Sequence, residues 1–201
     1  MKMHSIHPEN AKTNNAGSYR TTKYGDPDAG KSKHLVVIIT ADVRTKHVIG
    51  IEVHIEGQGM SEPEAAPKHV GEAVMKGMNV TEFYVDGAFD TNDRFDLMHH
   101  ISAKPVIKIR KNASTDRCSD SKYRRKATRE YRSSDYRSWS EENDYGMRGP
   151  GTEEIFSAVK RKYGENCVSR STNSPKSEGY QRIWVYSYMN RRAKGEVKSP
   201  S

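Results

Sequence analysis

The chain has 201 residues, of which 33% are hydrophobic and 30% charged, with a formal net charge of +8. This composition excludes a collagen-like or disulfide-stapled protein. The longest apolar run is far shorter than the ~20 residues that a membrane-spanning helix needs, and the first thirty residues lack a hydrophobic signal segment. We therefore expect a cytoplasmic protein with no membrane partner.

The first part of the chain changes character at His34. Residues 1–33 are polar and show no apolar periodicity, which indicates a poorly ordered lead-in. Two β-branched runs follow at 35–40 and 48–55, and the turn-like segment between them predicts a β-hairpin. Helix-forming residues at 62–77 then predict a helix that begins near Pro67.

The next part alternates between strand and helix patterns. Residues 81–86 and 105–109 have the composition of short strands, and the stretch 91–101 between them has a helical pattern with Thr91 as its cap. Strands and helices that alternate from His34 onward predict an α/β fold built on a mixed sheet.

A basic segment follows the last predicted strand. Residues 110–137 contain ten Lys and Arg against four Asp and Glu, so this segment carries a net charge of +6. Aromatic residues stand among these cations: Tyr123, Tyr131, Tyr136 and Trp139. Cations that pair with phosphates and flat rings that stack on bases are typical of nucleic-acid grooves. The alternative is a solvated, flexible loop.

Two helical stretches complete the predicted domain. The first, 153–163, has an apolar stripe and ends at Gly164, and the second spans 179–190. Residues 193–201 read as a disordered tail. The two cysteines, Cys118 and Cys167, have no second ligand at zinc spacing, and we expect them to be reduced structural thiols.

Three acidic residues lie at the ends of predicted strands or at the start of a predicted helix. Asp42 follows the first long strand, Asp86 ends a later strand, and Glu153 opens a helix. Hard divalent cations prefer oxygen ligands, so converging carboxylates can hold Mg²⁺ or Mn²⁺ for phosphodiester chemistry. Asp90 is a nearby alternative to Asp86 as a metal ligand, but the helix that follows Asp90 favours a role as helix cap or turn residue.

Three sequence blocks around these acids resemble the insertion-sequence transposases of the DDE type. Residues 40–46 resemble the first-aspartate strand of that family, and residues 84–90 resemble the second-aspartate motif. The third block is the most specific one. It holds, in the order of the family signature, Tyr145, Arg148, Glu153 and Lys160. Glu153 rather than the next residue is chosen because its interval to Lys160 is preserved.

The resemblance implies a ribonuclease-H-like catalytic domain, a mixed sheet flanked by helices, over 34–192 with a basic insertion at about 110–145. It further implies Mg²⁺ or Mn²⁺ held by Asp42, Asp86 and Glu153 as the catalytic residues. The implied reaction is DNA cleavage at element ends followed by strand transfer. The implied setting is a prokaryotic nucleoid, with a homo-oligomer that binds element ends and target DNA.

The predicted DNA-contacting residues come from the family signature and from the basic segment. The signature implies contacts to the DNA backbone from Tyr145, Arg148 and Lys160, of which the cations suit phosphate groups. The basic segment adds Arg124, Arg125 and Lys126.

Two other functions stay open from the sequence. Family members usually carry additional N-terminal sequence, so one alternative is an N-terminally truncated remnant that binds DNA non-specifically without catalysis. The other is a nuclease of the same fold, since water and a 3′-hydroxyl occupy the same nucleophile position.

Overall fold

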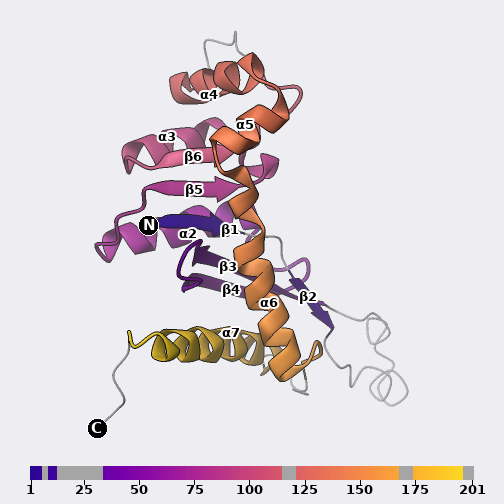
Figure 1. Ribbon diagram of the computed structural model, residues 1–201. Helices are drawn as coiled ribbons and strands as arrows, with labels where there is room; N and C mark the ends of the chain where they lie inside the picture. The colour runs from indigo at the N-terminus through magenta and orange to yellow at the C-terminus, as the bar shows by residue number, and fades with distance from the viewer. Residues whose placement is uncertain (6–8, 13–33, 115–120, 168–173, 197–201) are drawn as a thin grey trace, which may run out of the picture.

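The computed structural model describes residues 1–5, 9–12, 34–114, 121–167 and 174–196. One mixed sheet of six strands forms its centre, with helices on both faces (Figure 1). The strands are β1 (Lys2–Ser5), β2 (Glu9–Lys12), β3 (His34–Asp42), β4 (Val48–Ile55), β5 (Glu82–Val85) and β6 (Lys104–Ile107). The mixed α/β fold that the alternating patterns predict is confirmed.

The long hairpin of β3 and β4 forms the antiparallel half of the sheet. The two strands pair from Leu35 opposite Ile55 to Ala41 opposite Val48, with an irregularity after Thr40. Residues 35–42 of β3 are all buried, because helices cover both faces of this strand. The β-branched runs therefore predict this hairpin correctly.

The N-terminal residues contribute strands that the sequence pattern does not predict. Strand β1 pairs antiparallel with the end of β3 and parallel with β5, and β2 pairs with the start of β3. Met3 is fully buried in the centre of the sheet. Residues 13–33, the larger part of the expected lead-in, lie outside the described residues.

Strands β1, β5 and β6 form the parallel half of the sheet. In chain order the α-helices and the 3-10 turns (η) are α2 (Glu62–Met75), η1 (Gly87–Phe89), α3 (Asn92–His100), α4 (Lys122–Ser133), α5 (Tyr136–Glu142), η2 (Tyr145–Arg148), α6 (Pro150–Tyr163) and α7 (Ser174–Ala193).

Helix α2 begins five residues before the predicted start at Pro67. Ser61 is its N-cap, and the backbone N–H of Ser61 donates to the carboxylate of Glu64 at 2.8 Å, in a capping box. This reciprocal pairing of cap and third helical residue fixes the start of the helix. Pro67 is accommodated inside it.

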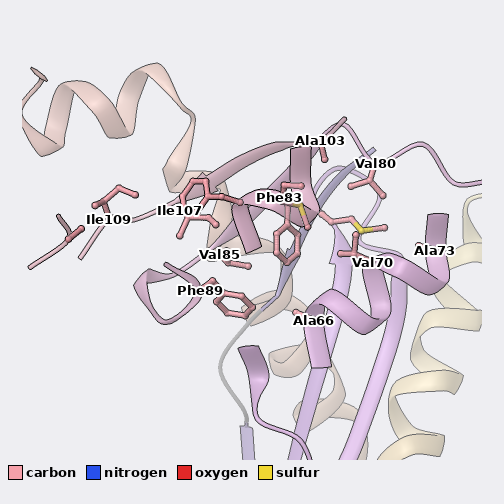
Figure 2. Close-up of a cluster of buried hydrophobic side chains, with 14 residues drawn as sticks. Ala66, Val70, Ala73, Val80, Phe83, Val85, Phe89, Ala103, Ile107 and Ile109 are labelled. Carbon is pink, nitrogen blue, oxygen red and sulfur yellow. The ribbon is translucent and has the colours of Figure 1, made fainter. Parts of the chain in front are cut away.

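Helices α2 and α3 cover one face of the sheet. Figure 2 shows Phe83 of β5 beside Val70 and Ala66 of α2, with Phe89 of η1 next to them. Phe83 and Phe89 meet edge to face, with ring centroids 6.1 Å apart. This cluster closes one side of the central strands.

Helices α6 and α7 pack on the other face. Ile155 and Phe156 of α6 and Ile183 of α7 form a cluster with Leu35 of β3, and the buried, free thiol of Cys167 belongs to it. Cys118 lies outside the described residues. Gly179 allows α7 to approach β3, because a Cβ at this position would lie 2.6 Å from the Leu35 side chain.

The described end of the basic segment forms α4 and the start of α5, and these two helices lie at the opposite end of the sheet from α7 (Figure 1). Ser121 caps α4 and Asp135 caps α5, each by accepting hydrogen bonds from backbone N–H groups. Among the described residues, no helix combines the length and the apolar character that crossing a membrane requires.

Candidate functional site

Asp42 closes the β3–β4 turn. Its Oδ1 accepts a hydrogen bond from the backbone N–H of Arg44 at 2.9 Å. Its own backbone N–H donates to the carbonyl of His47, and its carbonyl accepts from the N–H of Lys46, both at 2.9 Å. The side chain is 8% exposed. The carboxylate thus stabilises the turn after the strand.

The strand register places Asp42 and Asp86 on opposite faces of the sheet. Met3 of β1 pairs with Asp42 on one side and with Phe83 on the other, so these three side chains share the face that α2 covers. Asp86 comes three residues after Phe83 in extended backbone, which turns its side chain to the other face, about 10 Å further along the strand.

Asp86 sits at the carboxyl end of β5 and caps η1. Its Oδ1 accepts from the N–H of Ala88 at 2.8 Å, and the side chain is half-buried. The turn is also held by Arg110, whose Nε donates to the carbonyl of Gly87 at 2.7 Å and whose Nη2 donates to that of Ala88 at 3.0 Å. Asp86 therefore has a fixed backbone.

Tyr145 joins the third sequence block to this strand end. Its hydroxyl donates to the carbonyl of Val85 at 3.3 Å, and its side chain is 6% exposed. Burial raises the pKa of Tyr145 to about 12, an effect that Arg148 opposes and Asp86 reinforces. The guanidinium of Arg148 lies 5.3 Å from the centre of the Tyr145 ring. Arg148 and Asp86 thus both act electrostatically on the Tyr145 side chain.

Glu153 occupies the first turn of α6, directly after η2. Its side chain is exposed, and a Cβ at Gly149 would lie 3.3 Å from its Oε1. Because Tyr145 of η2 reaches the end of β5, helix α6 begins near the same sheet edge as Asp86 (Figure 1). Asp86 and Glu153 thus share an edge and a face, whereas Asp42 does not.

The strand register separates Asp42 from Asp86, the second predicted carboxylate. Within the ranges that the structure describes, no group of three His, Cys, Asp or Glu side chains could hold a metal ion. Asp42 accepts a hydrogen bond within its own turn, and the strand register assigns it to the α2 face, away from Asp86.

Lys160 lies two turns after Glu153 on α6. It lines a cavity of about 50 Å³ together with Cys167 and Arg182, between α6 and α7. The structure thus places Lys160 beside the α6–α7 packing region, while Tyr145 and Arg148 lie by the end of β5.

Arg124, one of the cations predicted to contact DNA, forms an ion pair inside the protein. Its Nε donates to Oδ1 of Asp90 at 2.6 Å, and its Nη2 donates to Oδ2 at 3.1 Å. The Asp90 side chain is fully buried, and that of Arg124 is 12% exposed. Asp90 also accepts from the backbone N–H of Arg110 at 2.9 Å. This bidentate pair fastens α4 to the loop that follows Asp86.

The other cations of α4 lie closer to solvent. Arg125 is half-buried, whereas Lys126, Arg129 and Arg132 are exposed. Lys126 makes an exposed ion pair with Glu130 at 3.8 Å. The helix carries six cations and one acid in twelve residues, and most of its positive charge faces outward.

Sequence reasoning misses two cations beside Asp86. Arg110 braces η1 as described above, and the ammonium of Lys108 lies 5.1 Å from the centre of the Tyr136 ring. Their alternation directly after strand β6 is the available signal, because residues two apart at a strand end point to the same side.

Comparisons with known proteins add no relative. No protein-family model, no curated protein and no solved structure matches this chain.

Proposed function

We propose that this chain is a ribonuclease-H-like domain of the DDE transposase type that binds DNA at the edge formed by Asp86, α4, α5 and the start of α6. The mixed sheet with helices on both faces supports the fold assignment. The sequence blocks around Asp86 and Glu153 support the family, since both acids belong to one edge of one face.

The attachment of α4 beside Asp86 carries the DNA-binding proposal. The buried Asp90–Arg124 pair holds α4, the most basic of the described helices, against the loop that begins at Asp86. A solvated, flexible loop would not need a fully buried carboxylate as its anchor. The outward-facing cations of α4 are therefore presented to a polyanion in a fixed orientation.

The position of Asp42 favours DNA binding without catalysis by the described residues. The resemblance implies that three carboxylates hold the metal ions for strand transfer and for hydrolysis alike. Asp86 and Glu153 supply two members, and Asp42 faces α2. Of the two alternatives to a transposase, we therefore favour the protein that binds DNA without cleaving it. We also propose that it binds DNA as a homo-oligomer.

The experiment measures duplex DNA affinity as a function of salt, by fluorescence anisotropy of a labelled oligonucleotide. A Lys126→Glu/Arg129→Glu variant on α4 is compared with Arg161→Glu/Lys162→Glu, which changes the same charge at the far end of α6. The α4 variant is expected to weaken binding at least about tenfold and to reduce the slope of log affinity against log salt by about two. Equal losses in both variants would contradict the α4 surface.

A plasmid-cleavage assay with Mg²⁺ or Mn²⁺ tests the second half of the proposal. No cleavage above background is expected. Metal-dependent cleavage that is abolished by Asp42→Asn and by Asp86→Asn alike would restore the three-carboxylate site and overturn this part.

A further inference from the structure

A groove with an aromatic wall lies at the end of the molecule away from α4. It is a cavity of about 540 Å³ between α7, β4 and α2, and Trp184 and Tyr188 form part of its wall. Tyr180 extends the same side of the helix, since residues four apart share a face. Figure 1 shows α7 on the far side of β4 from the parallel half of the sheet.

The aromatic side chains of this groove are presented flat and open. The rings of Trp184 and Tyr188 stack with centroids 5.6 Å apart and an interplanar angle of 6°. Trp184 is 52% exposed and Tyr180 is 47% exposed, although Ile183 beside them is buried. An exposed tryptophan in a preformed stack offers a surface for another planar group.

Cations accompany these rings. Lys68, Lys76 and Arg191 line the groove, and among the described residues Glu72 is the one carboxylate that does so. A neighbouring cavity of about 430 Å³ shares Tyr180 and is lined by one further cation, Lys176, and by the carboxylate Glu52. From Lys176 to Arg191 the helix rises about 22 Å, which is long enough for several nucleotides of an extended strand.

We propose that this groove binds single-stranded nucleic acid without sequence preference, with bases stacked on Trp184 and phosphates paired with Lys76 and Arg191. Stacked aromatics beside a basic track are the features that such sites use. Unpaired bases are required because a duplex does not expose base faces. The site is separate from the Asp86 edge and does not rest on the DNA-binding surface proposed there.

A protein partner fits this groove less well. The centre of a protein interface is usually depleted of lysine and acidic residues. Here Lys68 and Lys76 stand in the lining, and Lys68 lies 3.5 Å from Glu52 of the edge strand. Binding of a second copy of the chain is the competing outcome of the test.

Tryptophan fluorescence gives a direct readout in the full chain. The protein has two tryptophans, and Trp139 is only 7% exposed, so an exposed-tryptophan signal reports Trp184. Titration with oligothymidylate is expected to quench this signal, and Trp184→Phe is expected to remove the quench while binding stays within about threefold. Binding that leaves the Trp184 emission unchanged would overturn the proposal.

Affinity measurements complete the test. Trp184→Ala is expected to weaken oligothymidylate binding by about tenfold to a hundredfold, while Met75→Ala, which removes an 89% exposed side chain at the end of α2, leaves it unchanged. The α4 double variant should also retain oligothymidylate binding, which separates this site from the duplex surface. Undiminished binding by Trp184→Ala overturns the proposal. Self-association that Trp184→Ala abolishes, without oligonucleotide binding, would assign the groove to a second copy.

Discussion

Arg124 and Asp90 form a bidentate ion pair across 34 residues of sequence, with Nε to Oδ1 at 2.6 Å and Nη2 to Oδ2 at 3.1 Å. The acid follows η1 and the base lies in the first turn of α4. The pair links the loop after β5 to helix α4. Because the pair is buried, its loss is expected to lower the stability of the protein as well as to loosen α4.

Arg124→Ala is expected to destabilise the protein by about 3–5 kcal/mol, because it leaves a fully buried carboxylate without its charged partner. Lys126→Ala on the same helix is the control, since its side chain is 78% exposed and a change within about 0.5 kcal/mol is typical of surface sites. Urea unfolding measures both. Equal effects would show that the pair does not anchor α4.

Gly50→Ala is expected to destabilise the protein by about 1–3 kcal/mol, because a Cβ there would lie 2.1 Å from Cγ of the buried His69 ring. The same substitution in a His69→Ala background should cost less than about 1 kcal/mol, since the clash is removed. A double-mutant cycle of urea midpoints measures the coupling. Additive effects would contradict direct contact between the two positions.

His69 also predicts a pH dependence of stability. Burial lowers the pKa of His69 below its ordinary value of 6.5, against the opposing charges of Glu72 and Glu52. Below pH 6.5 the unfolded chain binds a proton that the folded protein excludes, so the free energy of unfolding falls as the solution becomes more acidic.

The comparison of wild type with His69→Gln isolates this contribution from the other histidines. The variant is expected to lose less stability than wild type between neutral and mildly acidic pH, as measured by urea unfolding at several pH values. Parallel pH profiles of the two proteins would rule out His69 as the responsible group.

Tyr145→Phe is expected to cost about 1 kcal/mol at neutral pH through loss of the hydrogen bond to the Val85 carbonyl. Burial raises the pKa of Tyr145 to about 12, above its ordinary value of 10. The unfolded chain therefore loses its proton first, and wild type should lose stability as the pH rises above 10. The phenylalanine variant should show a weaker alkaline loss in thermal unfolding. An unchanged alkaline profile would place the Tyr145 hydroxyl outside the titrating groups.

Local patterns predict much of the fold. The β-branched runs of β3 and β4, the strand before Asp86 and the apolar stripe of α6 depend on neighbouring residues, and all four elements form as expected. Strand β1 has only four residues, and its place in the sheet depends on partners about 40 and 80 residues away. No local pattern encodes such pairing.

The positions of the three predicted carboxylates in the fold could be predicted only in part. Asp86 and Glu153 stand in the sequence blocks that resemble the family, and in the structure the hydrogen bond from Tyr145 to Val85 links the segment before α6 to the end of β5. The face to which Asp42 points depends on its register against Met3, because a shift of one residue reverses every side chain of a strand. The ion pair between Arg124 and Asp90 could not be predicted either, because the two residues meet only through the packing of α4 on the loop after η1.

The position of β1 has a consequence for cooperativity. This strand alone joins the antiparallel hairpin to the parallel pair among the described strands, through backbone hydrogen bonds on both of its sides. The hairpin and the parallel pair are thus coupled in unfolding through β1. This strand has only four residues, and Met3 among them is fully buried. Local opening of β1 would break this backbone connection and leave the two halves joined through helix α2, which packs on β3 and on Phe83 of β5.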